Sequence, residues 1–488
     1  MSGVKRDYKS ERRYIAAQGP RKNTLADFIK MIWQENIECI IMFTNLVENG
    51  KNKCAKYWPD KEKSVNIGKC TLSHLEETAY AFYTVRMFSF QKKDSHDIRI
   101  ITQFHYTAWP DHSTPEEIGL VQFQRTVTKR YESGAPLLVH CSAGVGRTGT
   151  FIALDSLLEQ GKEMGRINVF EFVKQMREDR MSMVQTLEQY VFLHKALLCG
   201  FQERDTILSE YDLSTKASFL LNDTAPLNQQ HLYKDFKFLE TIIPVYEDEY
   251  KEEALKTENR SKNGDMDILP VSEYRPFLAS FVKGRNGYIN AVIFPSYTAA
   301  AGLIMTQSPL PDTEVDLWRL CVDHQVGAIV VLNDIDEDNN WLPARGENRS
   351  CPPYLITARK TGTNIGGVSQ SSLLILRDGE TQNITAFQVC SRNDDGVIKL
   401  AEMVLEKEKE FKLTSVVISK DGAGAAGVFC VLHNALQQLR MDGEVDIFTI
   451  VRQLHTRRPE AIANLEEYRK CYQLVSRSVS MNETYANV

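Results

Sequence analysis

The chain has 488 residues, of which 43% are hydrophobic and 25% charged, a composition typical of a globular protein with two or three domains. Its formal net charge of −6 argues against a dedicated nucleic-acid binder. It contains no run of about eighteen apolar residues, and its first fourteen residues are charged without an apolar core. We therefore expect no membrane segment, no signal peptide and a cytoplasmic location.

The predicted elements of the first half are helices and strands in mixed order. A helix at about 25–34 leads into a buried apolar strand at 39–43. Two alternating runs, 83–90 and 98–106, are typical of antiparallel strands. The apolar run 136–140 ends in a Gly-rich turn, and helical spacing follows it, which predicts a strand, a loop and a helix. These elements predict an α+β domain, a mixed sheet flanked by helices.

The second half repeats the first. Three segments match at one offset of 278 residues: GTF (149–151) with GVF (427–429), TAW (107–109) with TAF (385–387), and TLEQY (186–190) with NLEEY (464–468). A fourth pair, YIAAQGP (14–20) and LIMTQSP (303–309), matches at an offset of 289. The repeat predicts two homologous domains. We expect a front domain at 1–203, a rear domain at 204–478 and a tail at 479–488.

The two copies differ at their starts. Only 13 residues precede Tyr14 in the front copy, whereas about 90 residues lie between the join and Leu303 in the rear copy. The front domain is therefore expected to lack its N-terminal part, which would leave a strand edge unpaired.

The segment HCSAGVGRT (140–148) is the chemical centre of the front domain. Cys141 and Arg147 are six positions apart, and the residues between them are Ser142, Ala143, Gly144, Val145 and Gly146. Such a loop can turn successive backbone N–H groups inward and form an anion cradle at a helix N-terminus. The same field stabilises a nucleophilic thiolate, and the arginine offers a planar fork to two phosphate oxygens. This pattern favours phosphoryl chemistry over a buried structural cysteine.

An aspartate completes the predicted chemistry. Asp111 lies in WPDH (109–112), a Pro-bearing turn thirty residues before Cys141. Alone, the triplet would be only a turn, but beside the cysteine loop it becomes the candidate general acid on a mobile loop. No cluster of His, Cys and carboxylate residues has ligand spacing, and the ten cysteines form no CxxC pair. We therefore expect no metal and no cofactor.

The motifs HCSAGVGRT, WPDH, YIAAQGP, NKCAKYWP and MVQTLEQY together resemble those of the class I cysteine-based protein tyrosine phosphatases. The tandem layout is similar to the intracellular part of a receptor-type member. The resemblance covers Tyr8 to about Val475, with specific motifs in the front half and degenerate ones in the rear half. It implies an enzyme that hydrolyses phosphotyrosine on partner proteins, and a parent that is a single-pass membrane receptor.

The resemblance also implies roles for individual residues. Cys141 would be the nucleophile, Arg147 and the backbone of 142–146 would hold the phosphoryl oxygens, and Asp111 would be the acid and then the base. Gln185, with Gln189 nearby, would position the attacking water. Further matching residues are Thr148 as a donor to the thiolate, His140 as an orienter of the loop, Glu48 as a brace of the arginine, and Lys53 and Trp109 as neighbours of the aspartate. For Glu48 and Lys53, a solvated surface pair is an open alternative.

The chain departs from the family pattern in both halves. The family stacks phosphotyrosine on an aromatic residue of an N-terminal Lys-Asn-Arg-Tyr loop, and the front domain has no such segment. In the rear copy, Asn259-Arg260-Ser261 resembles that loop with serine in the aromatic position. At the offset of 278, the site residues change throughout: Cys141 to Ser419, Arg147 to Ala425, His140 to Ile418, Asp111 to Val389, Pro110 to Gln388 and Gln185 to Ala463. We interpret the rear domain as a regulatory pseudophosphatase.

Two functions from different classes remain open. One is a protein tyrosine phosphatase, and the other is a non-catalytic phosphotyrosine-binding scaffold, if the shortened front domain is inactive. A dual-specificity or lipid phosphatase is disfavoured by the WPD triplet, the QTLEQY segment and the tandem layout. The polar segment 478–488 is expected to be disordered, and its Tyr485 with Asn487 resembles a ligand of SH2 adaptor domains.

Overall fold

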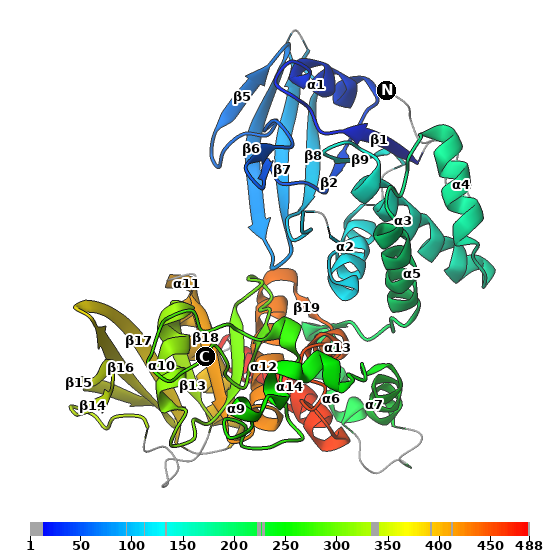
Figure 1. Ribbon diagram of the computed structural model, residues 1–488. Coiled ribbons are helices and arrows are strands. Elements are labelled where there is room, and N and C mark those ends of the chain that lie inside the picture. Colours follow the sequence, from blue (N-terminus) through cyan, green and yellow to red (C-terminus); the bar gives the residue numbers. More distant parts are fainter. Residues whose placement is uncertain are drawn as a thin grey trace. The chain divides into compact units, whose positions relative to one another are not determined.

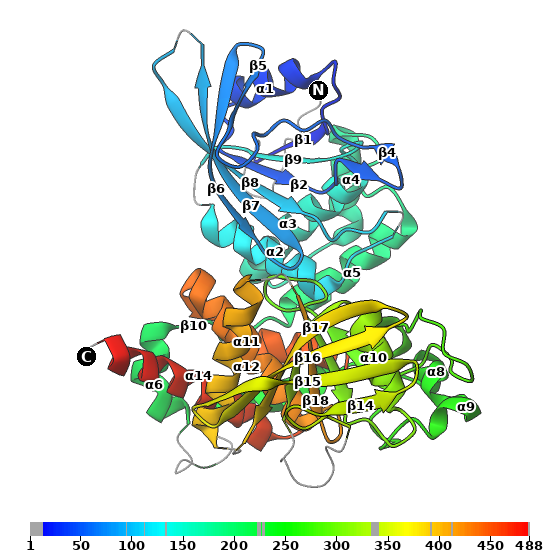
Figure 2. The ribbon, with the colours of Figure 1, turned by 90° about the vertical axis from the view of Figure 1, so that its left-hand side faces the viewer.

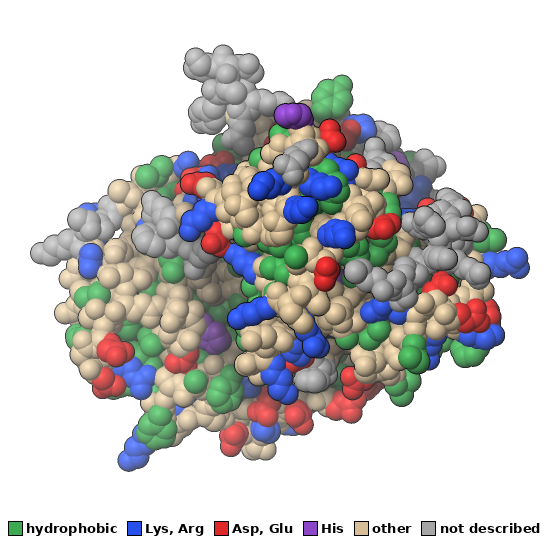
Figure 3. Space-filling view, turned by 90° about the horizontal axis from the view of Figure 1, so that it is seen from above, with side chains coloured by type: hydrophobic (Ala, Val, Ile, Leu, Met, Phe, Trp, Pro, Cys, Tyr) green, Lys and Arg blue, Asp and Glu red, His purple; other side chains and the backbone are tan. Residues whose placement is uncertain are grey.

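The structure is a computed structural model that describes residues 13–93, 95–111, 113–131, 134–221, 226, 230–332, 341–390, 393–410 and 413–486. The chain divides into two compact units, Met1–Arg204 and Asp205–Val488, and the division falls one residue beyond the predicted boundary. Within the described residues, no helix combines the length and the apolar character that crossing a bilayer requires. Side chains of both charge signs are distributed over the face seen in Figure 3.

The front unit is built on a seven-stranded sheet with the order β1-β9-β2-β8-β7-β6-β5. Its first four strands in this order are parallel, and the remaining pairs are antiparallel. The strands of this unit, including a separate two-stranded hairpin of β3 and β4, are β1 (Tyr14–Gln18), β2 (Cys39–Met42), β3 (Val47–Glu48), β4 (Lys51–Asn52), β5 (Ser64–Ile67), β6 (Cys70–Ala79), β7 (Tyr83–Lys92), β8 (Ile98–Tyr106) and β9 (Leu137–Cys141).

Five helices cover this sheet: α1 (Leu25–Gln34), α2 (Glu117–Arg130), α3 (Gly146–Met164), α4 (Val169–Asp179) and α5 (Leu187–Phe201). Figure 1 shows α2, α3, α4 and α5 gathered on one side of the sheet. The strand β2 shows how side chains on both faces of the sheet become buried. Ile40 and Met42 pack with α1 residues in one apolar cluster, and the alternate residue Ile41 is fully buried as well, because successive side chains of a strand point to opposite faces.

Local sequence explains where the helices near the cysteine loop begin and end. Helix α3 ends at Gly165, which has a φ of 67° and so adopts the left-handed conformation common after a helix C-terminus. Helix α5 begins with a capping box, in which Thr186 and Gln189 satisfy each other's backbone N–H groups. Asn168 caps α4 by accepting a hydrogen bond from the Glu171 N–H.

The rear unit repeats this sheet and adds a strand at one edge, in the order β11-β12-β18-β13-β17-β16-β15-β14. Figure 2 shows β14 to β17 side by side. The strands of the unit are β10 (Leu208–Ser209), β11 (Ala291–Phe294), β12 (Leu303–Gln307), β13 (Val326–Val331), β14 (Asn348–Cys351), β15 (Tyr354–Ile365), β16 (Val368–Arg377), β17 (Glu380–Val389), β18 (Thr414–Ser419) and β19 (Glu444–Val445).

The extra strand marks the difference between the two copies. In the rear unit β11 pairs antiparallel with β12, the counterpart of β1. In the front unit, β1 has only β9 as a neighbour among the described residues. The predicted unpaired strand edge is therefore present in the described part of the front sheet.

The helices of the rear unit fall into two groups. Five of them repeat the front helices: α10 (Glu314–Asp323), α11 (Asp394–Glu410), α12 (Gly424–Asp442), α13 (Ile447–His455) and α14 (Leu465–Ala486). The others precede β11: α6 (Glu210–Leu220), α7 (His231–Ile242), η2 (Asp248–Lys251), α8 (Glu252–Leu255), α9 (Thr257–Arg260) and η3 (Ser272–Tyr274). The predicted fold class, two tandem α+β domains with mixed sheets and flanking helices, is confirmed.

The prediction of a disordered tail is wrong for residues 478–486. Helix α14 continues to Ala486, and its described side chains pack on the core as far as Met481. Ser478 and Val479 are buried, and Met481 packs against the same apolar cluster. The side chain of Tyr485, and Asn487 with Val488, lie outside the described residues.

Candidate active site

The cysteine loop begins where β9, the second strand of the front sheet, ends. Cys141 is the last residue of β9, which lies between the parallel strands β1 and β2, and α3 starts at Gly146. The turn between them requires glycine at position 144, where φ is +72° and a Cβ atom would lie 2.2 Å from the Ala17 carbonyl oxygen. The Gly144 N–H donates to the Cys141 Sγ at 3.2 Å. The loop therefore directs backbone donors toward the sulfur.

An arginine outside the predicted motifs holds the outer side of this loop. Arg180 donates from Nε to the Gly144 carbonyl at 2.8 Å and from Nη2 to the Ala143 carbonyl at 3.2 Å. With these carbonyls turned outward, the N–H groups of the loop face the opposite way. The sequence carried a signal for this residue, because the repeat places another arginine, Arg458, at the corresponding position.

Glu48 holds Arg147 by a two-pronged ion pair. Its carboxylate accepts from both guanidinium nitrogens, at 2.7 and 3.0 Å, and Arg147 also donates to the carbonyls of Phe43 and Pro110. Burial by itself raises the pKa of Glu48, but hydrogen bonds from Arg147, Asn45 and Thr44 outweigh it, so the pKa lies below its usual value. Glu48 is buried, so the alternative that it belongs to a solvated surface pair is wrong for this residue.

Asp111 lies next to three polar side chains at the mouth of the loop. Its carboxylate accepts from the Lys53 Nζ at 3.2 Å and from the Asn49 Nδ2 at 2.9 Å, and it lies 3.6 Å from the Arg147 Nη2. The preceding Trp109 is buried, and its indole N–H donates to the Ser113 carbonyl at 3.0 Å. The aspartate and the arginine are therefore held within reach of the same ligand.

His140 is buried behind the loop in a chain of hydrogen bonds. Its Nδ1 lies 3.3 Å from the Cys141 carbonyl, and its Nε2 lies 2.8 Å from the Tyr57 hydroxyl, which in turn accepts from Gln103. A carbonyl only accepts, so this arrangement assigns the proton to Nδ1. Burial lowers the pKa of His140 to about 3, which keeps the ring neutral. The imidazole thus orients the Cys141 peptide without adding a charge.

Two glutamines lie over the first turn of α3. The space that a Cβ at Gly146 would take lies 2.8 Å from the Gln189 Nε2 and 3.3 Å from the Gln185 Oε1, so a glycine allows both amides to approach the loop. Gln189 also accepts from the Gln185 backbone N–H at 3.0 Å. Thr148 lies in the same helical turn, fully buried, and its hydroxyl has no hydrogen-bond partner among the described residues.

Most of the predicted site residues border one cleft of about 380 Å³. Its lining consists of Glu48, Lys53, Asp111, Ser113, Cys141, Ser142, Ala143, Gly146, Arg147, Gln185, Thr186, Glu188 and Gln189. His140, Thr148 and Trp109 are buried and do not line it. His112 lies outside the described residues. The cleft brings together a cysteine sulfur, a glycine-containing loop, an arginine paired with Glu48 and the Asp111 carboxylate, an arrangement that suits phosphate-ester chemistry.

The corresponding places of the rear unit hold other side chains. Ile418 and Val389 are buried in the core, and Ala425 is exposed in the first turn of α12. Ser419 ends β18 as Cys141 ends β9. The frame of the loop is thus repeated without the sulfur and without the arginine.

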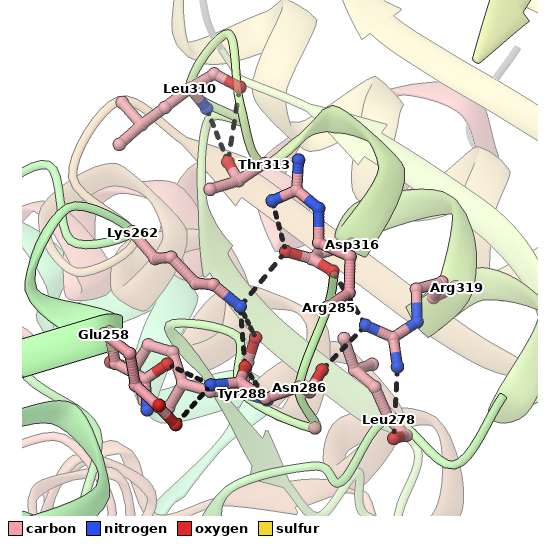
Figure 4. Close-up of polar contacts among 12 residues, drawn as sticks. Glu258, Lys262, Leu278, Arg285, Asn286, Tyr288, Leu310, Thr313, Asp316 and Arg319 are labelled. Carbon is pink, nitrogen blue, oxygen red and sulfur yellow. Dashed lines mark hydrogen bonds and ion pairs between the residues drawn. The ribbon is translucent and has the colours of Figure 1, made fainter. Parts of the chain in front are cut away.

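The segment of the rear unit that resembles the phosphotyrosine loop is held by a buried carboxylate. Figure 4 shows Lys262, Arg285 and Arg319 directed toward Asp316, at 3.5, 3.4 and 2.9 Å. Asn259, at the end of α9, is fully buried and donates to the Glu253 carbonyl at 2.7 Å. The described residues of the front unit contain no counterpart of this segment.

The family assignment follows from comparison with known proteins. The sequence profile of protein-tyrosine phosphatase matches residues 2–199 and 259–477, so the chain belongs to the protein-tyrosine phosphatase family. Receptor-type tyrosine-protein phosphatase zeta of Homo sapiens is 33% identical, receptor-type tyrosine-protein phosphatase U of Gallus gallus 32%, and receptor-type tyrosine-protein phosphatase alpha of Homo sapiens 31%. Each alignment covers 98% of this chain but only 22%, 34% and 62% of these relatives, respectively. The chain thus resembles receptor-type phosphatases across both of its domains.

Proposed function

We propose that the front domain hydrolyses phosphotyrosine on proteins through a cysteinyl-phosphate intermediate. The observation that carries this proposal is the convergence of Cys141, Arg147 and Asp111 on one cleft, with Glu48 bonded to the arginine through both of its oxygens. The loop N–H groups would bind the phosphoryl oxygens together with the two nitrogens of Arg147.

In the first step, the Cys141 thiolate attacks phosphorus. The S–P bond forms while the bond from phosphorus to the tyrosine oxygen breaks, and protonated Asp111 gives its proton to the departing phenolate. Lys53 and Asn49, within hydrogen-bond distance of the carboxylate, would orient it toward the leaving oxygen.

In the second step, water attacks the cysteinyl-phosphate. Asp111, now a carboxylate, takes a proton from the water, the S–P bond breaks, and inorganic phosphate leaves with the thiolate restored. The amides of Gln185 and Gln189 would position this water, since both lie against the first turn of α3. The unpartnered hydroxyl of Thr148 would donate to the returning thiolate.

We further propose that the rear domain is a regulatory pseudophosphatase and that the chain is the cytoplasmic portion of a membrane receptor. Neither an alanine at position 425 nor a serine at position 419 can replace the clamp and the thiolate. The receptor assignment is supported by the names of the relatives and by the tandem layout.

Two substitutions test the enzyme proposal. Cys141→Ser should abolish turnover of a phosphotyrosine peptide with the fold intact, because a serine hydroxyl is not an anion at neutral pH.

Asp111→Ala should slow turnover by roughly 10²–10⁴-fold while peptide binding is retained. Steady-state kinetics and calorimetric binding check both. An Asp111→Ala variant as active as the parent would refute the general-acid role.

The second candidate function, a phosphotyrosine-binding scaffold, is favoured by two features of the described residues of the front unit: β1 lies at the edge of the sheet, and no segment corresponds to the aromatic loop. It predicts that the parent chain binds phosphotyrosine peptides but fails to hydrolyse a small aryl phosphate. Hydrolysis that depends on Cys141 would exclude this function.

The terminal helix carries a further partner proposal. Phosphorylated Tyr485 would dock an SH2 adaptor that reads the asparagine two residues later. Because α14 reaches Ala486, its last turn must first unwind to give an extended ligand. A phosphopeptide of residues 478–488 should bind such a domain, and Asn487→Ala should abolish binding; equal binding of the two peptides would end this proposal.

A further inference from the structure

The loop of the rear unit retains the backbone shape of the catalytic loop although its chemistry is gone. Gly422 has a φ of +70° and corresponds to Gly144, with its φ of +72°. The Gly422 N–H donates to the Ser419 Oγ at 3.0 Å, as the Gly144 N–H donates to the Cys141 Sγ at 3.2 Å. The loop thus still turns the Gly422 N–H toward Ser419, the last residue of β18.

The side chain of Asp421 accepts hydrogen bonds from donors of this loop. The Asp421 Oδ1 accepts from the Ala423 N–H and from the Ser419 hydroxyl, both at 2.9 Å, and its Oδ2 lies 3.5 Å from the Gly424 nitrogen. The corresponding residue of the front loop is Ala143, which has no acceptor on its side chain. A carboxylate of this chain therefore takes donors that the front loop leaves for a ligand.

A second carboxylate adds to the change of charge. Glu467 corresponds to Gln189 and accepts from the Ala463 N–H at 2.8 Å. A Cβ at Gly424 would lie 2.9 Å from its Oε1 and 3.5 Å from the Asp421 Oδ2, so both acids border the same turn. Burial raises the pKa of Glu467, and the charge of Asp421 raises it further.

A buried arginine with unmet donors occupies the position in the rear unit that Arg180 has in the front unit. Arg458, the counterpart of Arg180, is fully buried and donates from Nη2 to Asn290 at 2.9 Å. Its Nε and Nη1 have no hydrogen-bond partner among the described residues. Burial lowers its pKa, and the negative charges of Glu460 and Asp421 oppose this. Asp421 thus supplies counter-charge to a buried cation as well as an acceptor to the loop.

We propose that Asp421 is an internal ligand of the rear loop, which closes a latent oxyanion site to phosphate and phosphotyrosine. The inference rests on the proposed role of the front loop as a phosphoryl cradle, but not on turnover by the front domain. It differs from the simpler explanation that the missing arginine alone disables the rear loop. If Asp421 fills the cradle, an arginine restored at position 425 would pair with that carboxylate and would gain no phosphate.

Tungstate, an unreactive tetrahedral dianion, distinguishes the two explanations by calorimetry. The full chain with Arg147→Met, which removes the front clamp, gives the baseline. In this background Ala425→Arg alone should leave binding at the baseline, Asp421→Ala alone should add a weak site, and the two together should bind at least tenfold more tightly than either. Equal affinity of the Ala425→Arg variant with and without Asp421→Ala would overturn the proposal.

Two further variants serve as controls for this experiment. Asp395→Ala combined with Ala425→Arg removes an exposed rear-unit carboxylate that pairs with Arg477, and it should not open the site. Because Ala143 occupies the corresponding place in the front loop, Asp421→Ala is compatible with the loop shape, and circular dichroism checks its folding. If it fails to fold, Asp421→Asn with Ala425→Arg should still bind more tightly than Ala425→Arg alone, and equal binding would refute the proposal. Turnover by the chain with Arg147 intact is measured separately, so a failure of the proposed front-domain activity can be distinguished from a failure of the proposal for Asp421.

Discussion

At the scale of single residues, the front site separates groups that must stay neutral from groups that must carry charge. His140 is neutral because burial lowers its pKa to about 3, and the nearby His105 is neutral because burial and the charge of Arg86 lower its pKa to about 4. Glu48 stays ionised because Arg147 and backbone donors outweigh its burial. The positive charge of Arg147 is therefore balanced by a fixed carboxylate, while the histidine behind the cysteine adds none.

The neutral His140 predicts a pH-dependent stability of the front domain. Its pKa is lower in the folded chain than the ordinary value near 6.5, so the unfolded chain binds more protons between about pH 6.5 and pH 3. The free energy of unfolding should therefore fall as pH drops through this window, by up to about 1.4 kcal/mol per pH unit for one such group.

Urea unfolding between pH 7.5 and pH 4.5, followed by probes in the front domain, measures this slope. His140→Asn should be less stable at neutral pH, because it loses the bond to Tyr57, but its stability should fall less steeply on acidification. His96→Asn, a change of an exposed histidine, should keep the parent slope. If His140→Asn kept the parent slope, a charged His140 in the folded chain would be indicated.

At the scale of elements, the strand–loop–helix unit was predictable from the local pattern, whereas of the residues that hold it Glu48 was expected only from the family resemblance. The sequence predicts a helix at 25–34 and a strand at 98–106, and α1 and β8 have these bounds. The hairpin of β3 and β4, which carries Glu48, has two-residue strands that no periodicity can reveal. Arg180 and the Tyr57–Gln103 pair act through contacts across the fold; the repeat marks the arginine by its counterpart Arg458, but neither set of contacts can be derived from the sequence.

The prediction for the end of α14 was wrong for a related reason. The composition of residues 478–486 predicts a polar tail because serines and other polar residues dominate them, yet Val479 and Met481 pack on the core. The helix is fixed there by tertiary packing, which overrides the local composition.

The loop itself gives a prediction at this scale. Gly144→Ala would place a Cβ 2.2 Å from the Ala17 carbonyl oxygen at a φ of +72°, so the loop must move away from β1. A displacement of about 1 Å at a reacting group can cost ~10²-fold in rate, and we expect at least this loss in kcat/KM. The matched control is Gly165→Ala, since Gly165 also has a positive φ, +67°, but open space around it.

The control should lose about 1 kcal/mol of stability and keep its activity, because only backbone strain is added there. Kinetics with an aryl phosphate and thermal unfolding of both variants provide the comparison. Equal activity of the two variants would mean that the close approach to Ala17 does not hold the catalytic loop in place.

At the scale of the whole molecule, the chain repeats one architecture, but Cys141, Arg147 and Asp111 are replaced at the corresponding positions of the second copy. The rear sheet has the strand order of the front sheet with β11 added, and α12 has the same length, 19 residues, as α3. The apolar frame is thus retained where the catalytic side chains are not. Such a pattern is expected when a domain is kept for its fold and surface, because packing and chemistry depend on different residues.

The duplication supplies a pair of matched core positions that tests this division of roles. Phe151 in α3 and Phe429 in α12 occupy corresponding places, and both are fully buried. Replacing a buried phenylalanine by alanine costs about 3–5 kcal/mol of stability. Phe151→Ala should therefore remove hydrogen-exchange protection from β9 and lower aryl phosphate turnover, because β9 carries Cys141. Phe429→Ala should remove protection from β18 and change front-domain turnover by less than about twofold.

Hydrogen exchange with mass spectrometry resolves the two strands, and the same samples are assayed for activity. If Phe429→Ala abolished turnover while β9 stayed protected, the activity of the front domain would depend on the folded rear domain, and the division of roles between the two copies would be wrong.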